Sequence, residues 1–188
     1  LRCLVGSEMC IRDSNKPFKT RAGALVKLSD LLDEAVARAT KLLQDREVQS
    51  KNPDIDDAEL ADLAEIIGIG AVKYADLSKN RTSDYVFDWD QMLSFDGNTA
   101  PYLLYAYSRT RSIFTRGGID LIALPERVVT ENEAERRLAV AIAGYQDLLE
   151  QVAQEGYPHQ LCAYLYELAG RFTQFYAVSY THLRAHET

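Results

Sequence analysis

Residues 15–28, NKPFKTRAGALVKL, carry four cationic side chains and no acidic one, although the formal net charge of the 188-residue chain is −7. The cations are Lys16, Lys19, Arg21 and Lys27. Nearby charges dominate the electric field at a small anion, so a local basic window can bind phosphate whatever the total charge. This window therefore predicts an anion site, and a solvated basic loop is the alternative interpretation.

A second window without acids, residues 97–119, combines aromatic and cationic side chains. Tyr105, Arg109, Ser112 and Arg116 follow one another at intervals of four, three and four, which places them on one face of a helix. RNA bases stack on aromatic rings and guanidinium planes, and arginine also pairs with phosphate oxygens. The face is therefore a candidate RNA-binding surface, and half-buried tyrosines beside solvated arginines are the alternative.

Several helices must position these windows. Leucine, alanine and valine recur every three or four residues from Leu28 to Leu43, with Ser29 as the expected N-cap. This helix should leave Asp33, Arg38 and Lys41 in solvent. Asp56 and Glu59 form a capping box for the next helix, and Ile55 and Leu60 form its hydrophobic staple.

That second helix continues into Gly68 and Gly70, where we expect another element to pack closely. A phosphate-binding glycine loop is the alternative, but no strand precedes the glycines and no third glycine follows. A polar turn with Lys79 and Arg81 comes next, and alternation over residues 85–89 predicts a short strand or extended segment.

Three further helices are expected. The first has Thr99 as its cap, Pro101 in its first turn, and Gly117 and Gly118 at its end. Thr130 and Glu133 form a capping box for the second, which runs to Gly156. Its expected core positions are Leu138, Ile142, Tyr145, Leu149 and Val152. The third begins at Pro158, with inward positions Leu161, Leu165, Leu168, Phe172 and Phe175.

Both termini resemble translated sequencing-adapter sequence, so residues 1–14 and 178–188 are set aside as non-native. Between them only His159 and Cys162 remain of the histidines and cysteines, and we interpret both as structural. This composition excludes a disulfide framework and a Cys/His zinc site, and it favours a reducing compartment. No apolar run approaches the roughly 18 residues of a membrane span, and no secretory signal is present.

Three stretches resemble bacterial-type arginyl-tRNA synthetase, a class I family, in the expected order over residues 15–177. They read KPFKTRAGALVKLSDLLDEA, GIGAVKYADLSKNRTSDYVFDWDQMLSFDGNTAPYLLYAYSRTRSIF and HQLCAYLYELAGRFTQFY. The resemblance implies a mainly α fold: the end of a class I catalytic module with stem-contact helices and a short extended segment over 15–98, then a truncated, DALR-type anticodon-binding helical bundle over 99–177.

The resemblance places KPFKT where the family has its KMSKS signature, so the implied anion is the triphosphate of ATP. Lys19, supported by Lys16, would stabilise the charge that builds on departing pyrophosphate. Lys16, Lys19 and Thr20 are accordingly the expected ATP-binding residues, in a loop that closes over the nucleotide. Mg²⁺ is expected with ATP, and no protein-bound metal.

The resemblance also implies L-arginine and tRNA(Arg) as partners and a cytoplasmic monomer that does not bind membranes. Residues expected to face tRNA are Tyr102, Tyr105, Arg109, Arg116, Lys79 and Arg81. The family's HIGH-type signature and arginine pocket would lie upstream of residue 15, so we expect this chain alone to be inactive. A non-catalytic tRNA-binding module and a ligand-free helical scaffold are the alternatives.

Overall fold

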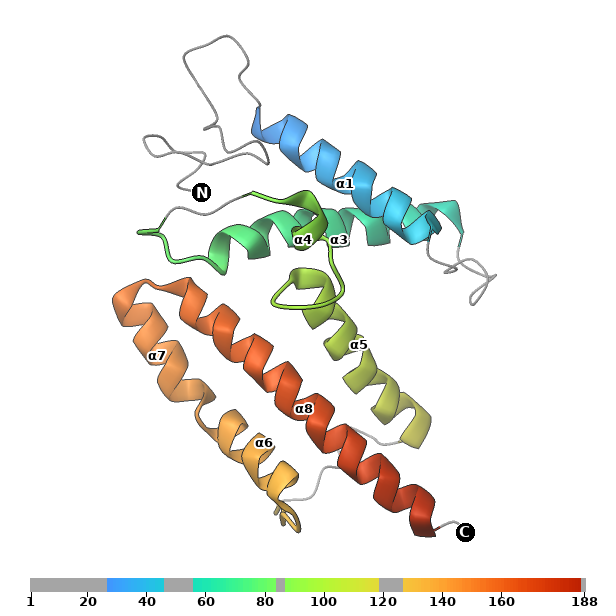
Figure 1. Ribbon diagram of the computed structural model, residues 1–188, viewed down its shortest axis with the longest axis vertical. Coiled ribbons are helices and arrows are strands. Elements are labelled where there is room, and N and C mark those ends of the chain that lie inside the picture. Colours follow the sequence, from blue (N-terminus) through green and yellow to red (C-terminus); the bar gives the residue numbers. More distant parts are fainter. Residues whose placement is uncertain (1–26, 46–55, 84–86, 119–126, 187–188) are drawn as a thin grey trace. The chain divides into compact units, whose positions relative to one another are not determined.

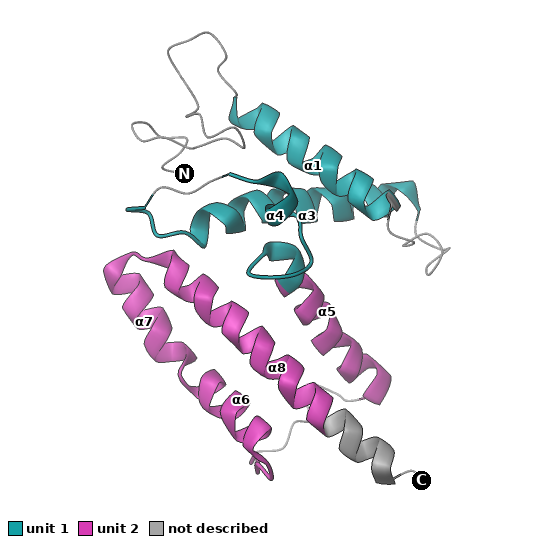
Figure 2. Cartoon of the chain, in the orientation of Figure 1, with its two compact units in different colours: residues 1–102 teal, residues 103–188 magenta. Residues whose placement is uncertain are grey.

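The computed structural model describes residues 27–45, 56–83, 87–118 and 127–186 (Figure 1). The helices are α1 (Leu28–Asp45), α3 (Asp57–Leu77), α4 (Trp89–Met92), α5 (Ala100–Gly117), α6 (Glu133–Ala143), α7 (Tyr145–Glu155) and α8 (Pro158–His186). They form two compact units, residues 1–102 and 103–188 (Figure 2). The fold is mainly α, as expected.

In the first unit, α1 crosses α3 through small side chains (Figure 1). Ala35, Ala39 and Ala64 are completely buried at this crossing. A Cβ atom added to Gly68 would lie 2.8 Å from the backbone of Ala35, so the absence of a side chain allows the helices to touch. The close packing predicted at Gly68 is therefore confirmed, whereas the nearest atom to a Cβ at Gly70 is 4.0 Å away.

The starts of α1 and α3 differ in how well the sequence predicts them. Ser29 is not the N-cap of α1: the helix begins at Leu28, and the Lys27 carbonyl accepts a hydrogen bond from Leu31 N at 3.2 Å. The Ser29 hydroxyl instead donates to the neighbouring Asp30 carboxylate. The Asp56 half of the capping box predicted for α3 is confirmed, because Asp56 Oδ1 accepts from Glu59 N at 2.7 Å; the reciprocal bond from the Asp56 backbone to Glu59 stays a prediction.

The exposed positions predicted on α1, Asp33, Arg38 and Lys41, are confirmed. Leu60, the expected staple residue on α3, is buried. Its partner Ile55 lies outside the described residues.

Residues 85–89 were predicted to be a short strand or an extended segment; the described ranges contain no strand, and the extended alternative is correct for Asp88 but not for Trp89. Asp88 has extended backbone angles but caps α4, accepting from Gln91 N at 3.0 Å, and Trp89 begins that helix. Phe87 is buried and meets Trp89 edge to face, with ring centroids 4.8 Å apart. The alternation of aromatic residues thus reflects two anchors that hold a helical turn on the α1–α3 core.

In the second unit, α6 and α7 lie along α8 (Figure 1). The capping box predicted at Thr130 and Glu133 is wrong: Asn132 caps α6 and pairs reciprocally with Glu135. The expected single helix also ends at Ala143, and a second begins at Tyr145 after Gly144. Gly156 ends α7 with a positive φ of 69°, as predicted.

The core positions predicted for α6 and α7 are only partly correct. Ile142 is 57% exposed, and Tyr145 and Leu149 are also exposed, so these three expected core positions are wrong. Leu138 and Val152 are half-buried. Tyr145 and Leu149 follow the interruption, past which a single helical period does not carry one face, whereas Ile142 precedes it and its exposure has no such explanation.

The predicted inward residues of α8 are all half-buried, and Cys162 and Ala169 are the buried residues among the described side chains of this helix, residues 158–178. Two polar side chains of α8 bond to backbone carbonyls of α6. Tyr164 donates its hydroxyl to Ala141 O at 2.7 Å, and Arg171 donates to Arg137 O at 3.0 Å. These carbonyls lie one turn apart, so the two bonds fix the register of α6 on α8.

Candidate nucleic-acid interface

The helix that carries the aromatic and cationic window is built as the sequence predicts. Thr99 Oγ1 accepts from Tyr102 N at 3.3 Å and donates to Ser94 O at 2.6 Å, which fixes the start of α5. Thr99 and Pro101 are buried, so this end of the helix is held firmly. At the other end Gly118 has a positive φ of 59°, a conformation that glycine adopts at little cost.

The four residues predicted to share one face of α5 differ in exposure. Tyr105 is 54% exposed and Arg116 is also exposed, whereas Ser112 is half-buried. Arg109 is half-buried, and its guanidinium carbon lies 4.2 Å from the ring centroid of Tyr176 on α8. This cation–π contact joins two helices of the same unit, so Arg109 has a structural role here. Its predicted contact with tRNA stays a prediction.

A second strip of exposed residues, on a different side of α5, was not predicted. Tyr107 is 64% exposed, and Leu104 and Arg111 are exposed as well. Arg111 lies four residues after Tyr107 and seven after Leu104, so the three side chains follow one another along the helix surface. The spacing is visible in the sequence, but only the tertiary structure reveals which tyrosines remain exposed.

Lys79 and Arg81 lie in the polar turn after α3, and both are exposed. Asn80 organises this turn, because its side-chain oxygen accepts from Thr82 N at 3.1 Å and from the Thr82 hydroxyl at 2.9 Å. Tyr102 is half-buried near the start of α5. The tRNA contacts of Lys79, Arg81 and Tyr102 stay predictions.

The second unit separates its charges between helices. From residue 97 to 119 the sequence has no acid, whereas α7 has acidic side chains and no cation. On α6, hydrogen bonds from Arg137 and then Arg136 hold the pKa of the Glu133 carboxyl below its usual range. A polyanion would therefore meet a more favourable field at α5 than at α7.

The Tyr164 hydroxyl is a titratable group at the contact between α8 and α6. Burial raises the pKa of the Tyr164 hydroxyl, and the negative charge that Tyr145 can carry raises it further. The two tyrosine rings stack with centroids 5.8 Å apart. Together with the hydrogen bond to Ala141, this environment keeps the hydroxyl protonated as a donor.

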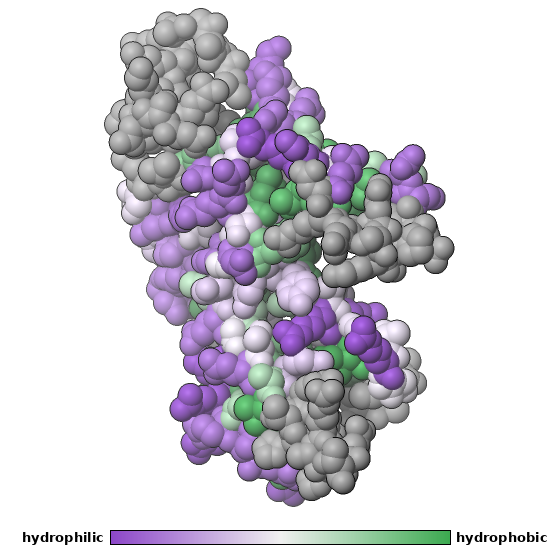
Figure 3. Space-filling view, turned by 45° about the vertical axis from the view of Figure 1, so that its right-hand side comes forward, coloured by the Kyte–Doolittle hydropathy of each residue, from purple (hydrophilic) through white to green (hydrophobic). Residues whose placement is uncertain are grey.

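The residues predicted to bind ATP, Lys16, Lys19 and Thr20, lie outside the described residues. Within the described ranges, no group of three or more histidine, cysteine, aspartate or glutamate side chains could hold a metal ion. The helices described there include none that is long and apolar enough to cross a membrane. On the face shown in Figure 3, hydrophilic residues make up most of the described surface, and apolar residues form small patches.

Two family models match most of the chain. The model for "tRNA synthetases class I (R), catalytic domain" matches residues 5–89, and that for the "DALR anticodon binding domain" matches residues 103–186. The second match begins where the second compact unit begins. The matches extend into both terminal segments, and the adapter origin of those segments stays a prediction.

Similar proteins agree with both matches. The arginine–tRNA ligase of Edwardsiella ictaluri is 54% identical over 168 residues, and that of Erwinia tasmaniensis is 57% identical over 170. Each comparison covers 89% of this chain and 28% of the relative, so the chain spans little more than a quarter of the curated relatives' length.

Two solved structures of arginyl-tRNA synthetases are similar to this chain. Arginyl-tRNA synthetase from Plasmodium falciparum matches with a TM-score of 0.72 and 33% identity, over 81% of this chain and 27% of that one. The Thermus thermophilus enzyme matches with a TM-score of 0.66 and 28% identity, over 82% and 24% respectively. With both domains matched in order, this chain belongs to the class I arginyl-tRNA synthetase family.

Proposed function

We propose that the complete protein uses ATP to join L-arginine to tRNA(Arg), in the cytoplasm and as a monomer. Family membership supports this proposal, because the matched relatives carry the name arginine–tRNA ligase. In this proposal the chain supplies a stretch of the catalytic domain and a tRNA-binding helical domain, and no membrane takes part.

The proposed catalytic contribution of the chain is the loop around KPFKT. Attack of the arginine carboxylate on the α-phosphorus of ATP expels pyrophosphate, and negative charge grows on the departing oxygens. A lysine ammonium aimed at that charge lowers the barrier more than it tightens ground-state binding. We assign this role to Lys19, with Lys16 and Thr20 beside it, and Mg²⁺ accompanies the nucleotide.

The proposed RNA-binding contribution rests on one observation, the exposed aromatic and cationic side chains of α5, which lie on two sides of the helix. Tyr105, Tyr107, Arg111 and Arg116 are exposed on a helix without acids. Tyrosine and arginine planes accept unstacked bases, and arginine pairs with phosphates. This combination favours an RNA partner over a ligand-free scaffold. A scaffold needs neither exposed aromatic rings nor a helix without acids.

The test is filter binding of a tRNA(Arg) transcript to the 188-residue chain at two salt concentrations. We expect affinity to fall steeply with salt, because phosphate contacts release counterions. The salt slope is the magnitude of the slope of log affinity against log salt concentration. Arg111→Glu and Arg116→Glu should each weaken binding and reduce the salt slope by about one. Lys41→Glu, which reverses an exposed cation on α1, is the matched control. Failure of the unmodified chain to bind tRNA in a salt-dependent way would favour the scaffold alternative.

A second test concerns catalysis. The chain spans about 28% of its curated relatives, so we propose that it does not activate arginine by itself. Arginine-dependent exchange of pyrophosphate into ATP should be undetectable with the purified chain. Clear turnover would show that the chain contains a complete active site.

A further inference from the structure

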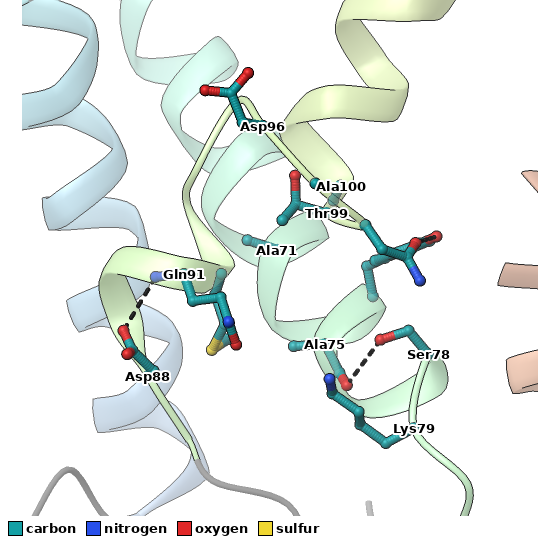
Figure 4. A pocket seen from close by; sticks show the side chains of 13 residues that line it. Ala71, Ala75, Ser78, Lys79, Asp88, Gln91, Asp96, Thr99 and Ala100 are labelled. Atoms are coloured by element: carbon teal, nitrogen blue, oxygen red, sulfur yellow. Dashed lines mark hydrogen bonds between the residues drawn. The ribbon is translucent and has the colours of Figure 1, made fainter. Parts of the chain in front are cut away.

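A small cavity opens in the first unit beside the turn that contains Lys79. Its volume is about 210 Å³, and its walls come from the second half of α3 and from the segment 88–100 that leads into α5 (Figure 4). Residues 90–100 of this segment lie between the two family matches. Sites for drug-sized ligands are about 300–1,000 Å³, so this cavity suits a single small ring system.

The cavity has apolar walls and polar groups around them. Ala71, Ala75 and Met92 supply apolar surface, and Tyr74 adds an aromatic ring. Gln91 and Asn98 contribute carboxamides that can both donate and accept hydrogen bonds. Such a mixture fits a flat molecule whose faces are apolar and whose edges are polar.

Hydrogen bonds inside the cavity determine which polar groups remain for a ligand. Asp88 Oδ1 already accepts from Gln91 N at 3.0 Å, and the Ser78 hydroxyl donates to Ala75 O at 3.2 Å. The Tyr74 hydroxyl donates to Asn98 Oδ1, which directs the amide nitrogen of Asn98 away from Tyr74. The Gln91 carboxamide and the Asn98 amide nitrogen are therefore the groups best able to read a ligand's edge.

The charges around the cavity decide against a small free anion. Among the described residues that line the cavity, Lys79 is the single cation, while Asp88 and Asp96 carry carboxylates. A phosphate inside would meet two negative charges and one positive charge. A neutral ring inside the cavity avoids repulsion from the two carboxylates. A phosphate attached to that ring and lying outside, near Lys79, is attracted by the cation.

We propose that this cavity receives one unpaired nucleobase of the bound RNA, with Lys79 and Arg81 contacting the phosphates next to it. This inference rests on the proposed tRNA binding and adds a base-recognising site in the first unit. Gln91 and Asn98 bond to the base edge, and the alanine and methionine side chains contact its faces. RNA bases are recognised in this way when they leave the helical stack.

The experiment measures binding of a tRNA(Arg) transcript to the full 188-residue chain at several salt concentrations. The double variant Gln91→Ala, Asn98→Ala should bind about tenfold more weakly, as expected for losing one base contact. Its salt slope should stay unchanged, because no phosphate contact is lost. Lys79→Ala should instead reduce the slope by about one. Gln44→Ala, an exposed glutamine on α1 outside the cavity, is the matched control.

Trp89 fluorescence checks that each variant keeps the fold of the first unit. Should the double variant unfold, Gln91→Ala alone serves, because the cap of α4 uses the Gln91 backbone and not its side chain. Unchanged affinity in the folded amide variants would overturn the base site. In that case, salt-dependent binding by the unmodified chain would still support the proposed function. A reduced salt slope in those variants would also overturn the base site, and a chain that binds no tRNA would overturn both proposals.

Discussion

Substituting Gly68 by alanine should separate α1 from α3, whereas the same substitution at Gly70 should not. At Gly68 the new Cβ would lie 2.8 Å from Ala35 C, Ala35 O and Val36 N. Carbon atoms pack best at about 3.5–4.0 Å, and these neighbours are backbone atoms that cannot rotate aside. At Gly70 the nearest atom is the Ala100 Cβ at 4.0 Å, an ordinary contact.

The expected magnitudes combine two effects. Overpacking a core costs about 1–3 kcal/mol, and we expect about 3 kcal/mol where backbone meets backbone. Replacing glycine by alanine within a helix contributes about 1 kcal/mol of stability. The free energy of unfolding should therefore fall by about 2 kcal/mol for Gly68→Ala and rise by up to about 1 kcal/mol for Gly70→Ala.

The assay is urea unfolding followed by the fluorescence of Trp89, the only tryptophan in the sequence. Its ring lies against Phe87, and the Arg38 guanidinium of α1 lies 5.1 Å from its centroid, so its emission reports on the first unit. With a typical urea dependence of 1–3 kcal/mol/M, the midpoint for Gly68→Ala should fall by roughly 1 M. A midpoint for Gly68→Ala equal to or above that for Gly70→Ala would refute the close helix crossing.

Three further predictions concern the second unit, measured by the circular dichroism of urea unfolding. Asn132→Ala should lower the free energy of unfolding by about 0.5–2 kcal/mol by removing the α6 cap, while Thr130→Ala should leave it almost unchanged; equal effects would contradict the assigned cap. Glu133 has a lowered pKa in the folded chain, so its stabilisation is present above the unfolded pKa and is lost as pH falls through the folded one. The stability difference between the unmodified chain and Glu133→Gln should thus shrink towards pH 3, and a difference independent of pH would contradict the ion pairs. Tyr164 has a raised pKa in the folded chain, so its stabilisation is present below the unfolded pKa and is lost as pH rises through the folded pKa. Tyr164→Phe should remove this alkaline loss of stability and lower the free energy of unfolding by about 1 kcal/mol at neutral pH, because the hydrogen bond to Ala141 O is lost. An unchanged alkaline loss in the variant would argue against the buried hydroxyl.

Local patterns predicted most of the helices because their causes are local. Asp56 can bond to Glu59 N and Thr99 to Tyr102 N without help from distant residues, and both helices begin where those side chains indicate. The start of α6 was misplaced because Thr130 and Asn132 both have a glutamate three residues later. Two capping boxes of similar strength compete there, and local sequence does not choose between them.

On α5, too, the sequence predicted some features of the RNA-binding residues and missed others. The sequence alone placed tyrosine and arginine on a helix without acids, and it marked residues 97–119 as a basic window. It did not indicate that Tyr107 and Arg111 stay exposed, nor that Arg109 lies on a ring of α8. Exposure on α5 depends on which neighbours cover its other side, and those neighbours come from distant parts of the chain.

The sequence by itself determined the helical class, the family resemblance, most helix ends and the segregation of charge, because these follow from residue types within a few turns of one another. Only the tertiary structure decided that Gly68 and not Gly70 touches α1, that the helix breaks at Gly144, and that a cavity forms between α3 and the segment before α5. The contact at Gly68 and the cavity depend on the distance between residues far apart in the sequence, whereas the break at Gly144 is local and no residue pattern marked it in advance. Helical periodicity specifies a direction around one axis, but it does not specify how close a second axis lies.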